Sequence, residues 1–92
     1  MRTFNAIVHG RVQGVGYRYY VQREADRLGI TGTVRNNYDG SVEIFAQGEE
    51  NKLNEFLSKI QKGPMFAYIA DVDVQWDTIK PNEKLKDFRI TF

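Results

Sequence analysis

The chain has 92 residues, which is enough for one small domain with a single apolar core. Its 13 basic and 12 acidic residues nearly balance, so its charge gives no broad attraction to nucleic acid or to anionic membranes, and we expect neither as a partner. The absence of cysteine excludes disulfides, a thiolate nucleophile and cysteine-ligated metals. No segment resembles a signal peptide or could span a bilayer, so we expect a cytoplasmic protein whose residues 1–92 form one domain.

The chain begins with a predicted strand and a predicted helix. In the strand, Phe4, Ala6 and Val8 alternate with polar residues, which indicates one buried face. The helix follows a glycine-rich stretch and is expected to end at Gly29. Its expected inward face holds five residues: Tyr17, Tyr20, Val21, Ala25 and Leu28.

Two strands joined by a tight turn are predicted next. The second strand runs from about Ile30 to Asn36, and Asp39-Gly40 favours a hairpin turn after it. The third strand has an alternating pattern that directs one set of residues inward and the other outward. The inward set is Val42, Ile44 and Ala46, and the outward set is Ser41, Glu43 and Gln47.

A second helix and two more strands complete the chain. The helix opens at Glu49-Glu50 and ends at Gly63-Pro64. Its predicted inward residues are Leu53, Phe56, Leu57 and Ile60. A fourth strand alternates the inward residues Val72, Val74 and Trp76 with Asp71, Asp73, Gln75 and Asp77. A fifth alternates Phe88, Ile90 and Phe92 with Arg89 and Thr91.

These elements predict an α+β fold. Each strand has one apolar face and each helix one apolar stripe, so two helices can cover one side of one sheet. We therefore expect a ferredoxin-like two-layer sandwich of the split βαβ kind, with a mainly antiparallel sheet of four to five strands. Either of the last two strands could complete the basic motif, the other adding an edge.

The stretch from Gly10 to Arg18 has the composition of an anion-binding loop. Its glycines allow the backbone to turn with several amides pointing inward, and the following helix directs its positive end to the same place. Arg18 falls in the first helical turn, where its guanidinium can bind a phosphate. The stretch is not a nucleotide-binding Walker motif, because no Gly-Lys-Ser/Thr closes it.

A second polar group is expected beside this loop. The first helix is long enough to connect two parallel strands, and parallel strands end at the same edge of a sheet. The loop follows the first strand, and Asn36 closes the second. Because Asn36 has the same strand parity as Val34, its side chain should lean toward the helices.

These residues resemble two signatures of the acylphosphatase family. One is Val8-His9-Gly10-Arg11-Val12-Gln13-Gly14-Val15-Gly16-Tyr17-Arg18, and the other is Gly32-Thr33-Val34-Arg35-Asn36 followed by Gly40-Ser41-Val42 and Gly48. The resemblance covers essentially the whole chain. The family usually has Phe or Met at the position of Tyr17 and an aromatic at that of Thr33, so both are packing departures beside the expected site.

The resemblance implies hydrolysis of acyl phosphates without a metal or cofactor, by a monomer. Arg18 and Asn36 would be the catalytic residues, with Asn36 orienting the attacking water. The phosphate would be held by Gln13, Gly14, Val15, Gly16, Tyr17 and Arg18.

Several alternatives remain open from the sequence. The fold could serve a non-catalytic module that binds an anion or RNA, although Phe45 is the only aromatic that the third strand offers for stacking. The chain could also be a domain of a larger carbamoyl-phosphate enzyme. Arg18 could instead form a surface ion pair, and Asn36 could cap the hairpin. The three aspartates of the fourth strand and His9 are read as exposed polar residues.

Overall fold

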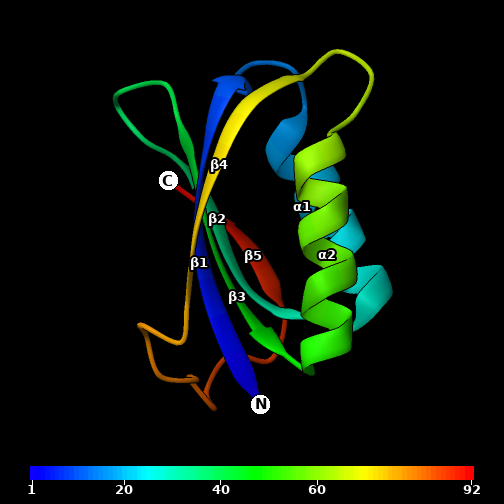
Figure 1. Cartoon of the computed structure of the whole chain (residues 1–92), viewed down its shortest axis with the longest axis vertical. Helices are drawn as coiled ribbons and strands as arrows, with labels where there is room; N and C mark the ends of the chain where they lie inside the picture. Colours follow the sequence, from blue (N-terminus) through cyan, green and yellow to red (C-terminus); the bar gives the residue numbers. More distant parts are fainter.

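The computed structural model describes residues 1–92 as one five-stranded sheet with two helices on one face (Figure 1). The elements are β1 (Arg2–Arg11), α1 (Tyr17–Leu28), β2 (Thr31–Asn36), β3 (Val42–Gly48), α2 (Glu50–Lys62), β4 (Tyr68–Trp76) and β5 (Phe88–Thr91). The predicted α+β ferredoxin-like sandwich is therefore confirmed. Neither helix combines the length and apolar character that crossing a membrane requires.

The strand order is β4-β1-β3-β2-β5. β1 and β2 both pair antiparallel with β3, which makes them parallel to each other, as the crossover through α1 predicts. β4 pairs with β1 and completes the basic motif, whereas β5 pairs parallel with β2 as the additional edge. The 12–16 loop after β1 and the turn after β2 consequently lie at the same end of the sheet (Figure 1).

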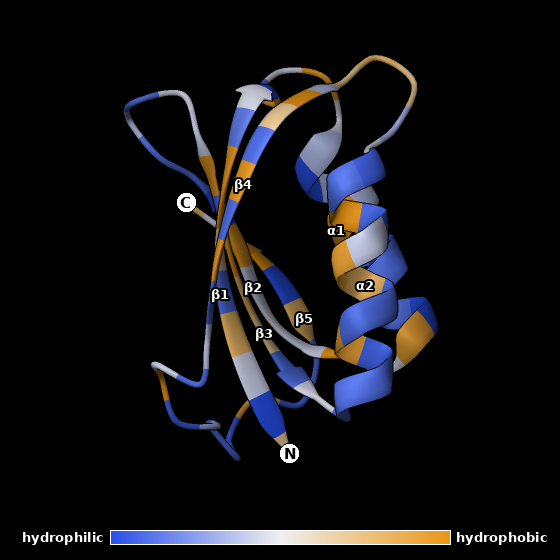
Figure 2. Ribbon diagram, viewed as in Figure 1, coloured by the Kyte–Doolittle hydropathy of each residue, from blue (hydrophilic) through white to orange (hydrophobic).

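The core lies between the sheet and the helices, where Figure 2 shows the apolar faces turned toward each other. It is a single cluster of 17 buried apolar residues drawn from six of the seven elements and the loops beside them. Phe4 from β1 and Phe56 from α2 stack with ring centroids 6.1 Å apart, and Trp76 of β4 meets Phe4 edge-on. Tyr20 and Leu57, expected in the core, are only partly buried at its margin.

Three residues expected on the solvent-facing side of the sheet are buried instead. Thr3 donates its hydroxyl to the carbonyl of Ile79, and Gln47 exchanges hydrogen bonds with the backbone of Asn82. Ser41 is enclosed by the β2–β3 turn. The segment between β4 and β5 thus covers one end of the open face, which strand alternation alone does not predict.

The ends of the last two strands also differ from the alternating pattern. β4 ends at Trp76, and Asp77 has a φ of 57°, where its carboxylate pairs with Arg2 instead of continuing the strand. β5 ends at Thr91, so Phe92 does not join the core and is 99% exposed.

Candidate active site

The 12–16 loop connects β1 to α1 and is shaped by two glycines. Val12 at its start is buried, which anchors the loop to the core. Gly14 and Gly16 have φ of 74° and 76°, a left-handed conformation that glycine adopts at little cost. A Cβ at either position would meet no neighbour within 4 Å. Glycine is therefore favoured at both positions by the backbone conformation and not by a lack of space.

The loop and the start of α1 present a row of free backbone amides. None of the N–H groups from Gln13 to Tyr19 donates a hydrogen bond within the chain. Gly16 caps α1 through its carbonyl, which accepts from the Tyr20 amide, and no side chain caps the helix. The first turn also lacks acidic residues. Free amides at a helix N-terminus form a site for an anion.

Arg18 lies beside these amides and is not engaged elsewhere. It takes part in none of the six ion pairs of the structure, which excludes the surface ion pair as its role in this conformation. Its guanidinium carbon lies 5.3 Å from the centroid of the Phe92 ring, a cation–π contact. The guanidinium therefore keeps its N–H donors for a ligand.

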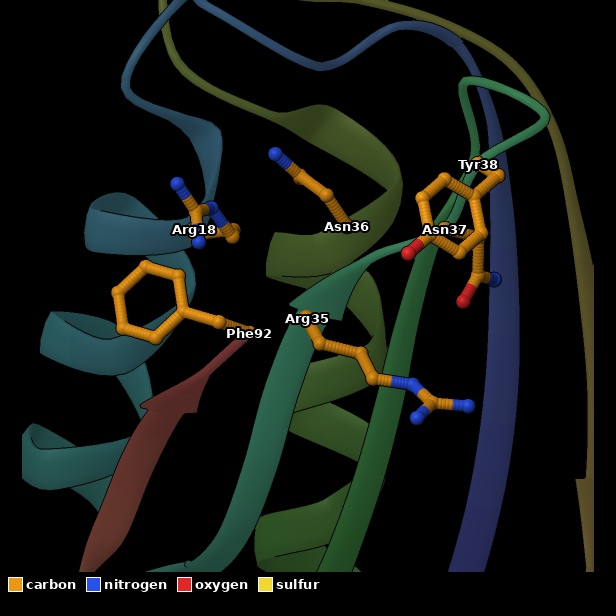
Figure 3. A pocket seen from close by; sticks show the side chains of 6 residues that line it. All are labelled: Arg18, Arg35, Asn36, Asn37, Tyr38 and Phe92. Carbon is orange, nitrogen blue, oxygen red and sulfur yellow. The ribbon is translucent and has the colours of Figure 1, made fainter.

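Asn36 ends β2 and extends from the sheet toward Arg18 (Figure 3). Its Oδ1 is the one buried side-chain polar atom without a hydrogen-bond partner. The hairpin is closed by other residues: the Asn37 amide donates to Ser41 O at 2.8 Å, and Asp39 accepts from Ser41. These bonds from Ser41 also lower the pKa of the Asp39 carboxyl. Asn36 is thus left free of the capping role considered for it.

Arg18 and Asn36 meet at an open cleft of about 500 Å³, lined by Arg18, Arg35, Asn36, Asn37, Tyr38 and Phe92. Arg18 also lines a smaller neighbouring hollow, which Gly14 and Gly16 border. The cleft and the amide row therefore share the same guanidinium. Sequence reasoning missed Tyr38 and Phe92 as lining residues, since it placed Phe92 in the core and gave Tyr38 no role.

The other charged candidates do not join Arg18 at this centre. Arg35 lines the cleft, but it pairs with Glu43 at 3.3 Å, and its guanidinium points away from Arg18 in Figure 3. Arg11 and His9 are exposed on β1 and line neither hollow. Asp71 and Asp73 lie on the open face of the sheet, which makes that face a poor surface for RNA. No group of three or more histidine or acidic side chains is placed to hold a metal.

Tyr17 and Thr33, which depart from the usual acylphosphatase pattern, lie in different environments. Tyr17 is buried beneath the loop, and its hydroxyl donates to Ile60 O at 2.8 Å. Burial raises the pKa of the Tyr17 phenol, because ionisation would place a charge in the core. Thr33 is half-buried on the opposite face of β2 from Val34, paired with Phe45 and Arg89. Tyr17 therefore bears directly on the loop, whereas Thr33 does not.

Comparison with known proteins gives the family of the chain. The acylphosphatase family model matches residues 4–90. The chain is 46% identical to an acylphosphatase of Geobacillus thermodenitrificans over the whole chain and 96% of that protein, and 47% identical to one of Lactobacillus gasseri over the full length of both. The crystal structure of the Bacillus subtilis acylphosphatase superposes with a TM-score of 0.92 at 41% identity, covering both chains completely.

A larger protein contains a similar unit. HypF of T. kodakarensis matches the whole chain with a TM-score of 0.85 at 29% identity, but only 12% of HypF is covered. The chain covers 96% or more of these small acylphosphatases. On the family match and these relatives, the chain belongs to the acylphosphatase family and is a hydrolase of acyl phosphates.

Proposed function

We propose that this chain hydrolyses acyl phosphates by holding the phosphoryl group on the amides of residues 13–18 and on Arg18, while Asn36 orients the attacking water. The observation that carries the proposal is the meeting of three unsatisfied groups at one end of the sheet. These are the free amide row, the unpaired Arg18 guanidinium and the buried Asn36 Oδ1. Unpaired polar groups concentrated in a folded protein indicate a ligand site.

The amides and Arg18 supply the charge stabilisation. Phosphoryl transfer spreads negative charge over three equatorial oxygens, and catalysis depends mainly on positioning and on donors aimed at that charge. The amide row is fixed by the glycines and by α1 before substrate binds, so it needs no reorganisation. Removing one such donor typically raises the barrier by roughly 3–4 kcal/mol.

Asn36 orients the attacking water and does not accept its proton. Its side-chain amide (Figure 3) can hydrogen-bond to water and so aim the oxygen lone pair at phosphorus, but an amide does not act as a base. The new bond joins the water oxygen to phosphorus as the bond from phosphorus to the acyl oxygen breaks. The water proton passes to a phosphate oxygen, and the products are a carboxylate and inorganic phosphate. A carboxylate leaves readily, so no nucleophilic side chain is required.

The decisive experiment measures hydrolysis of benzoyl phosphate in the presence of a chelator. We expect full activity with the chelator, because amides and a guanidinium supply the charge that a metal would otherwise provide. Arg18→Ala and Asn36→Ala should each lower kcat/KM by about 100-fold or more while the protein stays folded.

Two variants outside the site serve as controls. Arg11→Ala removes an exposed arginine, and Asn54→Ala an exposed asparagine of α2. Both should retain wild-type activity. Undiminished hydrolysis by Arg18→Ala or Asn36→Ala would refute the role assigned to that residue.

We also propose that residues 1–92 act as one domain and as a monomer. A single cluster of 17 buried apolar residues supports one folding unit. Light scattering should give the mass of one chain, 10.7 kDa, and twice that mass would contradict the proposal.

A further inference from the structure

We propose that the Gln13 side chain is a positioning residue, which sets the placement of the 12–16 loop relative to Asn36. This inference rests on the proposed function, because it concerns how the phosphate site and the water-orienting amide are aligned. The two groups belong to different elements: the loop follows β1, and Asn36 ends β2. Something must hold them at a constant separation for attack in line with the leaving oxygen.

Gln13 makes the only side-chain hydrogen bonds between the loop and the β2–β3 turn. Its Nε2 donates to Asn37 O at 2.8 Å and to Ser41 O at 2.9 Å, so both amide hydrogens are used. These bonds join segments 24 and 28 residues apart in the sequence. The side chain is half-buried, which limits competition from solvent.

The acceptors of these bonds are themselves fixed next to Asn36. Ser41 O also accepts from the Asn37 amide at 2.8 Å, and the Asn37 Nδ2 donates to the Ser41 hydroxyl. Asn37 follows Asn36 directly, and Asn36 pairs with Val42 in the sheet. A continuous set of hydrogen bonds therefore runs from the loop through Gln13 to the turn that begins at the water-orienting residue.

The anion site does not itself depend on the Gln13 side chain. The loop conformation is set by Gly14, Gly16 and the buried Val12, and the free amides belong to the backbone. Loss of the Gln13 amide should therefore leave phosphate affinity nearly intact and disturb the alignment of water with phosphorus. This separates a positioning role from a binding role.

The test is Gln13→Met, which keeps the length of the side chain and removes both donors. We expect kcat for benzoyl phosphate to fall by about 10- to 100-fold, the range expected for a small misplacement of reacting groups. The KM and the inhibition constant of inorganic phosphate should change by no more than about threefold. In an Asn36→Ala background the same substitution should have no further effect on kcat, because Gln13 acts through that alignment.

Gln22→Met is the matched control. Gln22 also donates one side-chain amide hydrogen bond to a backbone carbonyl, that of Phe88 at 3.1 Å, but it lies outside both hollows. Like Gln13→Met, the Gln22→Met variant should be less stable than the wild type, but it should keep the wild-type kcat.

Three results would overturn the inference. These are a wild-type kcat in Gln13→Met, a loss of kcat that adds fully to that of Asn36→Ala, and a rise in the phosphate inhibition constant that accounts for the whole defect. Undiminished activity of the Asn36→Ala variant would instead refute the proposed role of Asn36, so the two failures are distinguishable.

Discussion

Tyr17 links the start of α1 to the end of α2. Its hydroxyl donates to the carbonyl of Ile60, in the last turn of α2. In a continuing helix that carbonyl would accept from the residue four positions later, which is Pro64 and has no N–H. The phenol of Tyr17 therefore replaces a backbone donor, beneath the loop that holds the free amides.

Tyr17→Phe should lower the free energy of unfolding by about 1–2 kcal/mol, because the Ile60 carbonyl would remain buried without a partner. Urea denaturation measures the loss. Tyr20→Phe is the control, since Tyr20 donates to Lys59 O, which also accepts from the Gly63 amide. That variant should lose less than about 1 kcal/mol. Equal losses in the two variants would contradict the role given to Pro64.

The buried phenol also predicts a loss of stability at alkaline pH. Burial raises the pKa of Tyr17 in the folded protein, whereas in the unfolded chain tyrosine ionises near pH ~10. The folded state then binds more protons above that pH, so the free energy of unfolding falls as pH rises. Tyr17→Phe should show a shallower fall in urea titrations between about pH 9 and 11. If the free energy of unfolding fell equally steeply with pH in the wild type and in Tyr17→Phe, groups other than Tyr17 would cause the loss of stability.

At this scale, strand parity predicted the orientation of Asn36 but could not predict its neighbours. The alternation with Val34 turned Asn36 toward the helices, where its Oδ1 is buried. The two bonds of Gln13 connect residues 24 and 28 positions apart, and no local pattern records such a contact. Phe92 was assigned to the core because it continues the alternation of apolar residues in the last strand. That alternation does not show that the strand ends at Thr91 and leaves Phe92 beside the cleft.

At the scale of elements, periodicity predicted which face of each strand is buried. It could not predict which strands are neighbours, because alternation carries no information about pairing partners. The placing of β4 beside β1 and of β5 beside β2 was left open for that reason. The parallel relation of β1 and β2, which lie on either side of β3, was predictable, because parallel strands of one sheet need a long crossover and α1 is long enough to form it.

The contact between β2 and β3 depends on a glycine for a different reason than the loop does. A Cβ on Gly32 would overlap the carbonyl oxygen of Phe45, whereas a Cβ on Gly16 would meet open space. Gly32→Ala should therefore cost about 3 kcal/mol or more through displacement of the strand. Gly16→Ala should cost only about 1–2 kcal/mol of backbone strain.

Urea denaturation of both variants, together with benzoyl phosphate kinetics, separates the two effects. Gly16→Ala should stay folded and show a raised KM, because its amide belongs to the proposed phosphate site. Wild-type stability of the Gly32→Ala variant would show that β2 does not approach β3 at Gly32 as closely as the structure indicates.

At the scale of the whole molecule, the fold gathers its unsatisfied groups at one end. The crossover brings the loop after β1 and the end of β2 together, although Arg18 and Asn36 are 18 residues apart in the sequence. The polar groups at this end are the backbone amides of the loop, two arginines and two asparagines, with no carboxylate among them. An anion that binds among these positive groups should stabilise the folded state.

Inorganic phosphate should therefore raise the melting temperature. At about 100 times its dissociation constant it adds roughly 2.7 kcal/mol, which for a domain of this size corresponds to a shift of about 10 °C or more. Potassium chloride of equal ionic strength is the control for screening. Arg18→Ala should lose most of the shift, because a proposed phosphate donor is removed. Asn36→Ala should keep it, because the role proposed for Asn36 is to orient water and not to hold the anion. A full shift in Arg18→Ala, or its loss in Asn36→Ala, would mean that phosphate is bound by other groups than those proposed.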